Sequence, residues 1–224
     1  MSDARHLFAT PLIADTLKSE AGIAALREAV EAERARDATG VSISNVGGWH
    51  SNTNMLEWGG EAARALAGKA IEMADAATLD SKADPAMPFA QGRYGWHPEM
   101  WANVSGRGNS NQYHTHPGSF WSAVAYIDDG YDGSTDPTLG GELQLLDPRM
   151  PMIRMTAPEL RLKGADGKPM HNEIAIRPRT GLIVMFPSWL QHAVRPFHGR
   201  GTRISIAINL VAARQADGAE PSLH

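Results

Sequence analysis

The chain has 224 residues, with 42% hydrophobic and 21% charged residues, a formal net charge of −4 and a pI of about 6.1. This balance argues against a nucleic-acid binder and against a membrane-surface protein. The absence of cysteine excludes disulfides, thiolate metal ligands and a cysteine nucleophile, and it fits a reducing cytoplasm. With neither a secretory signal nor a membrane-length apolar run in view, we expect one cytoplasmic domain over residues 1–224.

Two helices are predicted in the first 80 residues. Apolar residues recur at helical spacing over residues 22–36 and again over residues 60–79. The segment between them, residues 42–59, is rich in Ser, Asn and Gly and is predicted to be a loop. Both apolar stripes indicate packing against a core, so residues 1–80 should form a helical N-terminal part.

From about residue 81 the sequence changes to short β-like runs separated by Gly, Pro and Asp. The predicted strands are residues 99–105, 112–115, 119–127, 142–146, 173–177, 181–185 and 203–211. They predict a β core over residues 81–213, followed by a tail over residues 214–224. Helices first and many strands later indicate an α+β fold, mainly β, with an antiparallel barrel or sandwich at its centre.

Three histidines form the strongest candidate site. His114 lies on the predicted strand 112–115 and His116 directly follows it; in extended chain, residues two apart point to the same face, so both imidazoles should aim at one point. His192 follows a later β-like run and a Pro-Ser-Trp turn. A pair on one strand and a distant third ligand is the layout of a facial metal triad, which leaves other coordination positions open. We therefore predict a metal site at His114, His116 and His192.

The identity of the third ligand is the weakest part of this prediction. The usual triad of non-haem iron enzymes has two histidines and one carboxylate, whereas a three-histidine site is neutral. Glu142 or Asp147 offers a carboxylate, but neither has the short spacing. Three histidines also suit a cupin-type metal enzyme. His50 and His97 are weaker candidates for a substrate pocket.

Arg203 lies eleven residues after His192. Strand alternation places Arg203, Ser205 and Asn209 on one face and three isoleucines on the other. An inward-facing arginine needs an anionic partner, because an unpaired buried charge is costly. A guanidinium binds a carboxylate through two charge-assisted hydrogen bonds, and this suits the distal carboxylate of 2-oxoglutarate. A salt bridge to an Asp or Glu inside the barrel is the structural alternative.

The chain resembles the 2-oxoglutarate/Fe(II)-dependent oxygenases, and among them a bacterial and phage group with a His-x-His-Pro motif. The matching stretches are Phe8–Pro11, Ser44–Ser51, Trp101–Asn103, His114–Ser119, Gly141–Arg149, Phe186–His192 and Arg203–Asn209. The resemblance implies a double-stranded β-helix (jelly-roll, cupin-like) with the N-terminal helices outside. It implies Fe(II) at His114 and His192 and 2-oxoglutarate at Arg203 and Ser205. At His116 the broader superfamily has Asp or Glu.

The expected activity is hydroxylation of a small-molecule or protein substrate by O₂, with release of succinate and CO₂ from 2-oxoglutarate. Asn103 and Tyr126 are further candidates for cosubstrate binding, and Arg149 and Trp49 for substrate binding. The alternatives are a three-histidine dioxygenase or isomerase that does not use 2-oxoglutarate, and a non-catalytic jelly-roll binding module. The sequence names no substrate, and it leaves open whether the chain forms a homo-oligomer.

Overall fold

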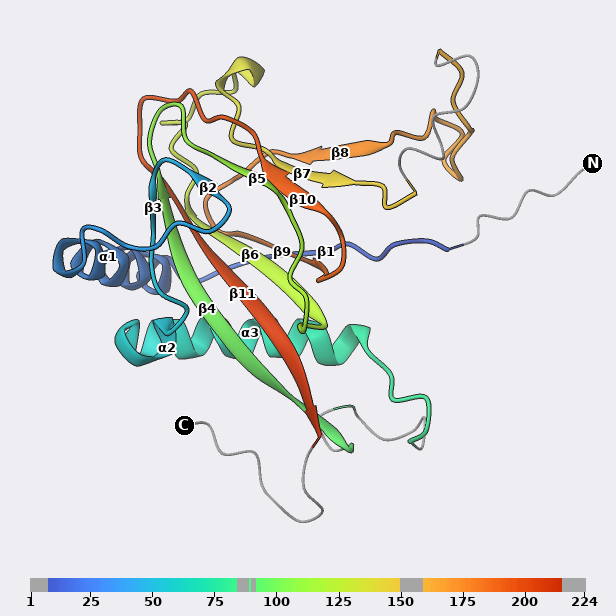
Figure 1. Cartoon of the computed structure of the whole chain (residues 1–224), viewed down its shortest axis with the longest axis horizontal. Helices are drawn as coiled ribbons and strands as arrows, with labels where there is room; N and C mark the ends of the chain where they lie inside the picture. Colours follow the sequence, from blue (N-terminus) through green and yellow to red (C-terminus); the bar gives the residue numbers. More distant parts are fainter. Residues whose placement is uncertain (1–7, 84–88, 90–91, 150–158, 215–224) are drawn as a thin grey trace, which may run out of the picture.

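The computed structural model describes residues 8–83, 89, 92–149 and 159–214. Two antiparallel sheets form its centre, and three helices lie outside them (Figure 1). The mainly-β α+β prediction is confirmed. Of the predicted tail, residues 215–224 lie outside the described part of the chain. None of the described helices is both long enough and apolar enough to cross a membrane.

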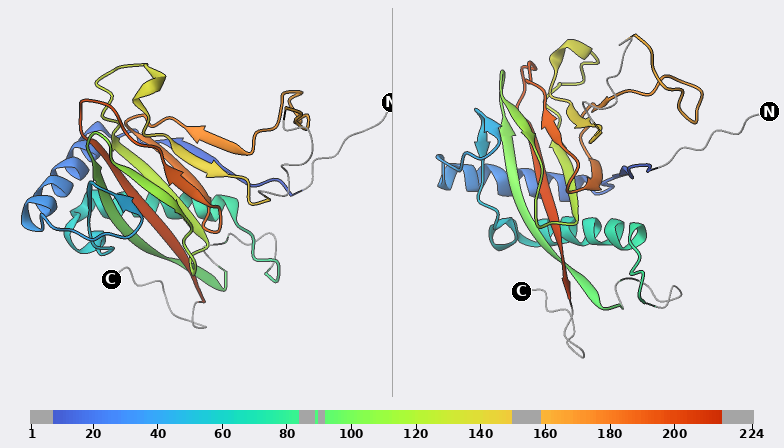
Figure 2. Two further views of the ribbon diagram at one scale, coloured as in Figure 1. Left: turned by 45° about the horizontal axis from the view of Figure 1, so that its top comes forward. Right: turned by 45° about the vertical axis from the view of Figure 1, so that its right-hand side comes forward.

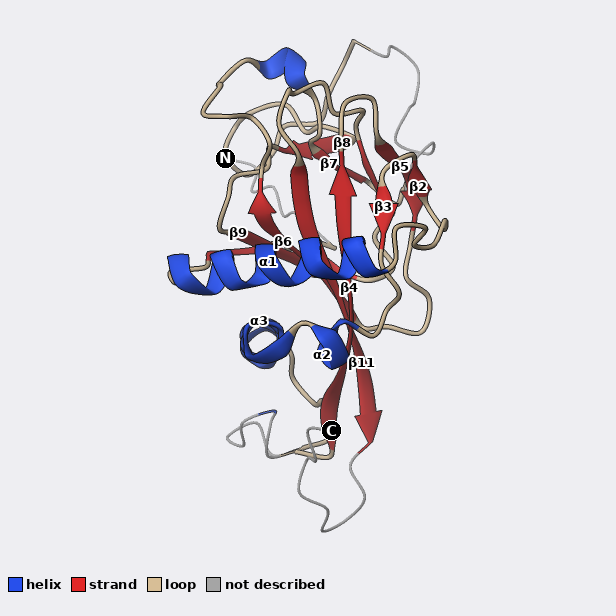
Figure 3. Cartoon of the chain, turned by 90° about the vertical axis from the view of Figure 1, so that its left-hand side faces the viewer, coloured by secondary structure: helices blue, strands red, loops and turns tan. Residues whose placement is uncertain are grey.

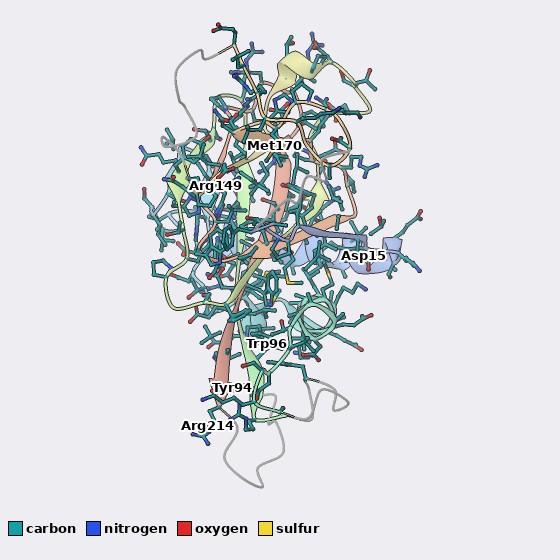
Figure 4. The ribbon with its side chains drawn as sticks, turned by 90° about the vertical axis from the view of Figure 1, so that its right-hand side faces the viewer. Asp15, Tyr94, Trp96, Arg149, Met170 and Arg214 are labelled. Carbon is teal, nitrogen blue, oxygen red and sulfur yellow. The ribbon has the colours of Figure 1, made fainter. Side chains whose placement is uncertain are left out.

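The larger sheet has six strands in the order β1-β9-β6-β11-β4-β3. These strands are β1 (Ile13–Thr16), β9 (Leu182–Pro187), β6 (Trp121–Asp128), β11 (Arg203–Arg214), β4 (Tyr94–Ser105) and β3 (Trp49–His50). Strands β4 and β11 pair along all twelve residues of each, and their free end extends beyond the rest of the sheet (Figures 1 and 3). Figure 4 labels Tyr94 and Arg214 at this free end.

The smaller sheet has five strands in the order β2-β5-β10-β7-β8. These strands are β2 (Asn45–Val46), β5 (Ser110–His114), β10 (His192–Val194), β7 (Leu143–Leu146) and β8 (Glu173–Ile176). The two views of Figure 2 show these strands as a separate layer over one end of the larger sheet. A 3₁₀ helix, η2 (Pro137–Leu139), precedes β7.

The helices cover the face of the larger sheet that points away from the smaller one (Figure 3). They are α1 (Glu20–Arg36), α2 (Met55–Trp58) and α3 (Gly60–Ala77). Ser19 caps α1 by accepting a hydrogen bond from the backbone N–H of Gly22 at 2.9 Å. Ile204, Ile206 and Ile208 of β11 belong to the hydrophobic core that the sheet shares with α1 and α3. The isoleucine face of β11 therefore packs against the helices, and its other face is left for the pocket.

The predicted helices and strands are present, with some boundaries shifted. Helix α1 begins two residues earlier than predicted, and α3 ends two residues earlier. The predicted loop over residues 42–59 was wrong in part, because it contains β2, β3 and α2. Strands β1 and β10 were also not predicted. Strands β2, β3 and β10 have only two or three residues, too few to show a periodicity, and pairing with neighbouring strands defines them.

Candidate functional site: a three-histidine metal centre

The three predicted metal ligands lie together between the two sheets. His114 ends β5 and His192 begins β10, and these two residues are directly paired across the smaller sheet. His116 follows two residues after the end of β5, and its backbone N–H donates to the carbonyl of Ser188 at 3.0 Å. The expectation that His114 and His116 share one strand was therefore wrong. His116 lies in the irregular segment between β5 and the Pro117-Gly118 turn, and its hydrogen bond to Ser188 holds its backbone there.

The hydrogen bonds of the imidazoles leave metal-binding lone pairs free. His114 Nδ1 lies 2.7 Å from the carbonyl oxygen of Gln112, and His192 Nδ1 lies 2.8 Å from that of Leu190. A carbonyl can only accept, so each Nδ1 carries the proton and each Nε2 has a free lone pair. His116 Nε2 and His192 Nε2 are 3.2 Å apart. One possible ligand atom from each of the three residues lies within 4.8 Å of the others, which fits a single metal ion.

Burial keeps the three histidines neutral. Burial lowers the pKa of His192 to about 3, with the neighbouring histidines adding to the effect. Burial, with a smaller contribution from His114, lowers the pKa of His116 to about 4. The pKa of His114 is also lowered by burial. Because a metal competes with protons for the same lone pairs, neutral imidazoles at pH 7 are ready to bind one.

The carboxylates that the sequence offered as a third ligand do not join the histidines. Among the described residues, the group of potential metal ligands at this site consists of His114, His116 and His192. Asp147 is paired instead with Arg149, 2.6 Å away. Glu142 is buried next to the start of β7, outside the pocket lining. His116 therefore occupies the position for which a carboxylate was considered.

Arg203 lies on the pocket wall without a carboxylate partner. Its side chain is 1% exposed, and its guanidinium lies over the ring of Tyr126, 5.2 Å from the ring centroid. Its Nη1 donates a long hydrogen bond of 3.4 Å to Ser205 Oγ, and its Nε has no partner. No salt bridge to Arg203 exists among the described residues, so the structural alternative raised by the sequence was wrong. A buried guanidinium with a free donor is a site for an anion.

A row of polar side chains crosses the larger sheet next to Arg203. Ser205 of β11 pairs with Asn103 of β4 on one side and with Tyr126 of β6 on the other, and Asn103 pairs in turn with His50 of β3. We call His50, Asn103, Ser205 and Tyr126 the polar row. Tyr126 is fully buried, its hydroxyl has no hydrogen-bond partner among the described residues, and burial raises its pKa. Its hydroxyl is therefore a neutral donor available to a ligand.

These groups line a cavity of about 360 Å³ between the sheets, which is within the usual size range of ligand pockets. Its wall includes the three histidines, Arg203 and the whole polar row. Trp101 also lines it, as do Glu99 and Asn209. Among the weaker histidine candidates, His50 lines the pocket, whereas His97 is exposed outside it.

Two residues predicted to contact the substrate lie elsewhere. Trp49 is packed in the hydrophobic core, where its Nε1 donates to the carbonyl of Asp37 at 2.7 Å. Arg149 pairs with Asp147 and is not part of the pocket wall. Figure 4 shows Arg149 in the opposite half of the molecule from Tyr94. On β3, successive residues point to opposite faces, so burial of Trp49 in the core turns His50 towards the pocket.

Residues 99–209 match the family model described as "Putative 2OG-Fe(II) oxygenase". This match begins at the pocket-lining Glu99 and ends at Asn209, so it spans the metal centre and Arg203. No curated protein matches the chain.

Several solved structures share the fold. A prolyl hydroxylase from Trichoplax adhaerens, solved with a peptide of hypoxia inducible factor, is similar at 14% identity and a TM-score of 0.60, over 89% of this chain and 83% of that one. A Pseudomonas putida prolyl-4-hydroxylase is similar at 17% identity and a TM-score of 0.53, over 92% of this chain and 94% of that one. The alpha-ketoglutarate-dependent carbocyclase SnoK from nogalamycin biosynthesis is similar at 12% identity and a TM-score of 0.57, over 93% of this chain and 85% of that one. These likenesses confirm the double-stranded β-helix.

Proposed function

We propose that this chain, whose residues 99–209 belong to the 2OG-Fe(II) oxygenase family, hydroxylates an organic substrate with O₂ and 2-oxoglutarate. The family and the fold make the chain an Fe(II)- and 2-oxoglutarate-dependent oxygenase. The observation that carries the assignment of residues is that one pocket contains two groups of side chains, each ready to bind a ligand. One is a cluster of neutral histidines, and the other is a buried guanidinium without an anionic partner.

His114, His116 and His192 would hold the iron. The backbone carbonyls of Gln112 and Leu190 fix two of the imidazole rings and direct their Nε2 lone pairs inward. When bound together, Fe(II), 2-oxoglutarate and O₂ supply the oxidising chemistry, with one oxygen atom entering the substrate and the other entering succinate as CO₂ is released.

Arg203 would bind the distal carboxylate of 2-oxoglutarate. The free Nε of Arg203 and the free hydroxyl of Tyr126 are donors on the same side of the pocket, and Ser205 Oγ lies next to the guanidinium. Asn103 adds an amide from the neighbouring strand. A carboxylate bound here satisfies donors that have no partner among the described residues, so 2-oxoglutarate binding should recover part of their desolvation cost.

The three-histidine enzyme that does not use 2-oxoglutarate is disfavoured by the same observation. In such an enzyme Arg203 Nε and the Tyr126 hydroxyl, which have no partner among the described residues, would stay buried and unpaired through the whole reaction. The neighbours themselves differ in chemistry, since one is a prolyl hydroxylase and another a carbocyclase. The carbocyclase is described as alpha-ketoglutarate-dependent, which supports the use of 2-oxoglutarate here. The difference in their reactions leaves the substrate of this chain open.

The decisive experiment is an anaerobic titration of the protein with Fe(II) and then with 2-oxoglutarate. A weak visible charge-transfer band should appear only when both are present, and admission of O₂ should convert 2-oxoglutarate to succinate. His192→Ala should abolish the band, because it removes a ligand, whereas the exposed His97→Ala should leave it intact. A wild-type protein that binds Fe(II) but gives no band with 2-oxoglutarate would rule the proposal out.

A further inference from the structure

His50 is a buried side chain of the pocket for which neither metal binding nor 2-oxoglutarate binding provides a role. It is 3% exposed and lines the cavity. It is not one of the three potential metal ligands. Histidines are seldom fully buried without a hydrogen-bonding reason, so its polar atoms need an explanation.

One edge of the His50 imidazole is fixed by the backbone and the other is free. Its Nδ1 lies 2.6 Å from the carbonyl oxygen of Ser51, so Nδ1 carries the proton and Nε2 has the lone pair. Burial lowers the pKa of His50, which keeps this tautomer neutral. None of the described residues forms a hydrogen bond to Nε2. His50 therefore presents a hydrogen-bond acceptor of fixed orientation.

Stacked rings place this acceptor beside the metal centre without making it a ligand. The imidazole stacks on Trp101 with centroids 5.7 Å apart and planes 14° from parallel. Trp101 packs in turn against His116, with centroids 5.5 Å apart. One indole ring thus separates His50 from a metal ligand. His50 and the three histidines line the same cavity, so a molecule bound there lies between His50 and the metal centre.

The polar row places His50 on the opposite side of the pocket from the proposed 2-oxoglutarate site. Three strand spacings separate His50 on β3 from Tyr126 on β6, which corresponds to about 14 Å along the sheet. Arg203 and Tyr126 lie together at the far end of this row. A cosubstrate bound between Arg203 and the metal therefore leaves the His50 side of the cavity open to the second reactant.

We propose that His50 binds the substrate, with its Nε2 accepting a hydrogen bond from an N–H or O–H group near the carbon that is oxidised. This inference rests on the proposed function, because it assumes that the metal and 2-oxoglutarate fill the rest of the pocket. It narrows the substrates to molecules with a donor next to the reacting carbon, such as alcohols, amines and amides. Hydrocarbons, ethers and esters that have no donor are excluded.

The test uses protein loaded with Zn(II) and 2-oxoglutarate, with 2-propanol and acetone as probes. The two probes have nearly the same size, but only 2-propanol can donate a hydrogen bond. In a protein labelled with ¹⁵N-histidine, 2-propanol should shift the Nε2 resonance of His50 in a saturable way, and acetone should not. His50→Phe keeps a ring for stacking on Trp101 and removes the acceptor. It should weaken 2-propanol binding about fivefold, the loss expected for one neutral hydrogen bond.

Two further variants separate binding from structure. His50→Gln retains a side-chain acceptor and should restore part of the 2-propanol affinity, and His97→Phe outside the pocket should have no effect. Equal responses to both probes, no response to 2-propanol, or unchanged affinity in His50→Phe would overturn the inference. A loss of Zn(II) or 2-oxoglutarate affinity in His50→Phe would also overturn it, since His50 would then serve the cosubstrate. Failure of the wild type to bind Zn(II) and 2-oxoglutarate would instead refute the proposed function.

Discussion

The two faces of the larger sheet are made by the same strands and are both largely buried, but their chemistry is opposite. The face towards α1 and α3 presents Ile204, Ile206 and Ile208 from β11, with apolar residues of β4 and β6 beside them. The face towards the smaller sheet presents Arg203, Ser205 and Asn209 from the same strand. Burial alone therefore does not distinguish the part of the sheet that stabilises the fold from the part that binds ligands.

Hydrogen-bond satisfaction does distinguish them. The side chains that β4, β6 and β11 direct towards the helices are mainly apolar, and the Nε1 of Trp121 among them donates to Thr78 Oγ1 at 2.8 Å. On the pocket side, Arg203 Nε and Tyr126 OH are buried without partners among the described residues. Such groups destabilise a folded protein unless a ligand satisfies them. We therefore expect substitutions on one face to change stability and substitutions on the other to change ligand binding.

The largest effect is expected on the helix-facing side. Ile206 is fully buried in the core, so Ile206→Ala should lower the free energy of unfolding by about 2–5 kcal/mol through lost apolar burial and a residual cavity. Urea denaturation of the metal-free protein measures this change. Ile174→Ala, at a position that is 53% exposed, is the matched control and should change stability by no more than about 0.5 kcal/mol. A loss of 2-oxoglutarate affinity in folded Ile206→Ala would contradict the separation of the two faces.

Arg203→Met should have the next largest effect, and it should act on binding. Loss of charge-assisted hydrogen bonds should weaken 2-oxoglutarate binding by about 10- to 100-fold. Metal content should not change, and the free energy of unfolding should stay the same or rise, since a buried unpaired charge is removed. Calorimetric titration of Mn(II)-loaded protein measures the affinity. The control is Arg200→Met, at an exposed position outside the pocket. Parallel loss of metal and 2-oxoglutarate would identify Arg203 as a structural residue.

Tyr126→Phe should have the smallest effect. The variant keeps the ring under the Arg203 guanidinium and removes only the hydroxyl, which has no partner in the part of the chain that the structure describes. We expect 2-oxoglutarate affinity to fall by about two- to tenfold and thermal stability without ligand to be equal or slightly higher. A clear loss of stability in the ligand-free protein would show that the hydroxyl is bonded in solution, and would remove it from the cosubstrate site.

Sequence patterns predicted the long elements and the residues that alternate along them. The apolar stripes of α1 and α3 and the alternation of Arg203, Ser205 and Asn209 on β11 were visible because they extend over many residues. Strands β2, β3 and β10 escaped prediction because two or three residues show no period. His50 lies on one of these short strands, so no pattern in its own segment could distinguish it from a surface histidine.

The sequence by itself determined the chemistry of this protein: His114, His116 and His192 among its nine histidines, no cysteine, and Arg203 on the polar face of an isoleucine-rich strand. Those residue types and spacings were enough to predict a metal centre and an anion site. Only the tertiary structure decided which residues meet. A backbone hydrogen bond to Ser188, beyond the end of β5, holds His116 at the metal centre, and pairing of β3 with β4 turns His50 into the pocket and Trp49 into the core. The reason is that alternation fixes the face of each side chain within one strand, whereas register between strands depends on contacts between distant residues.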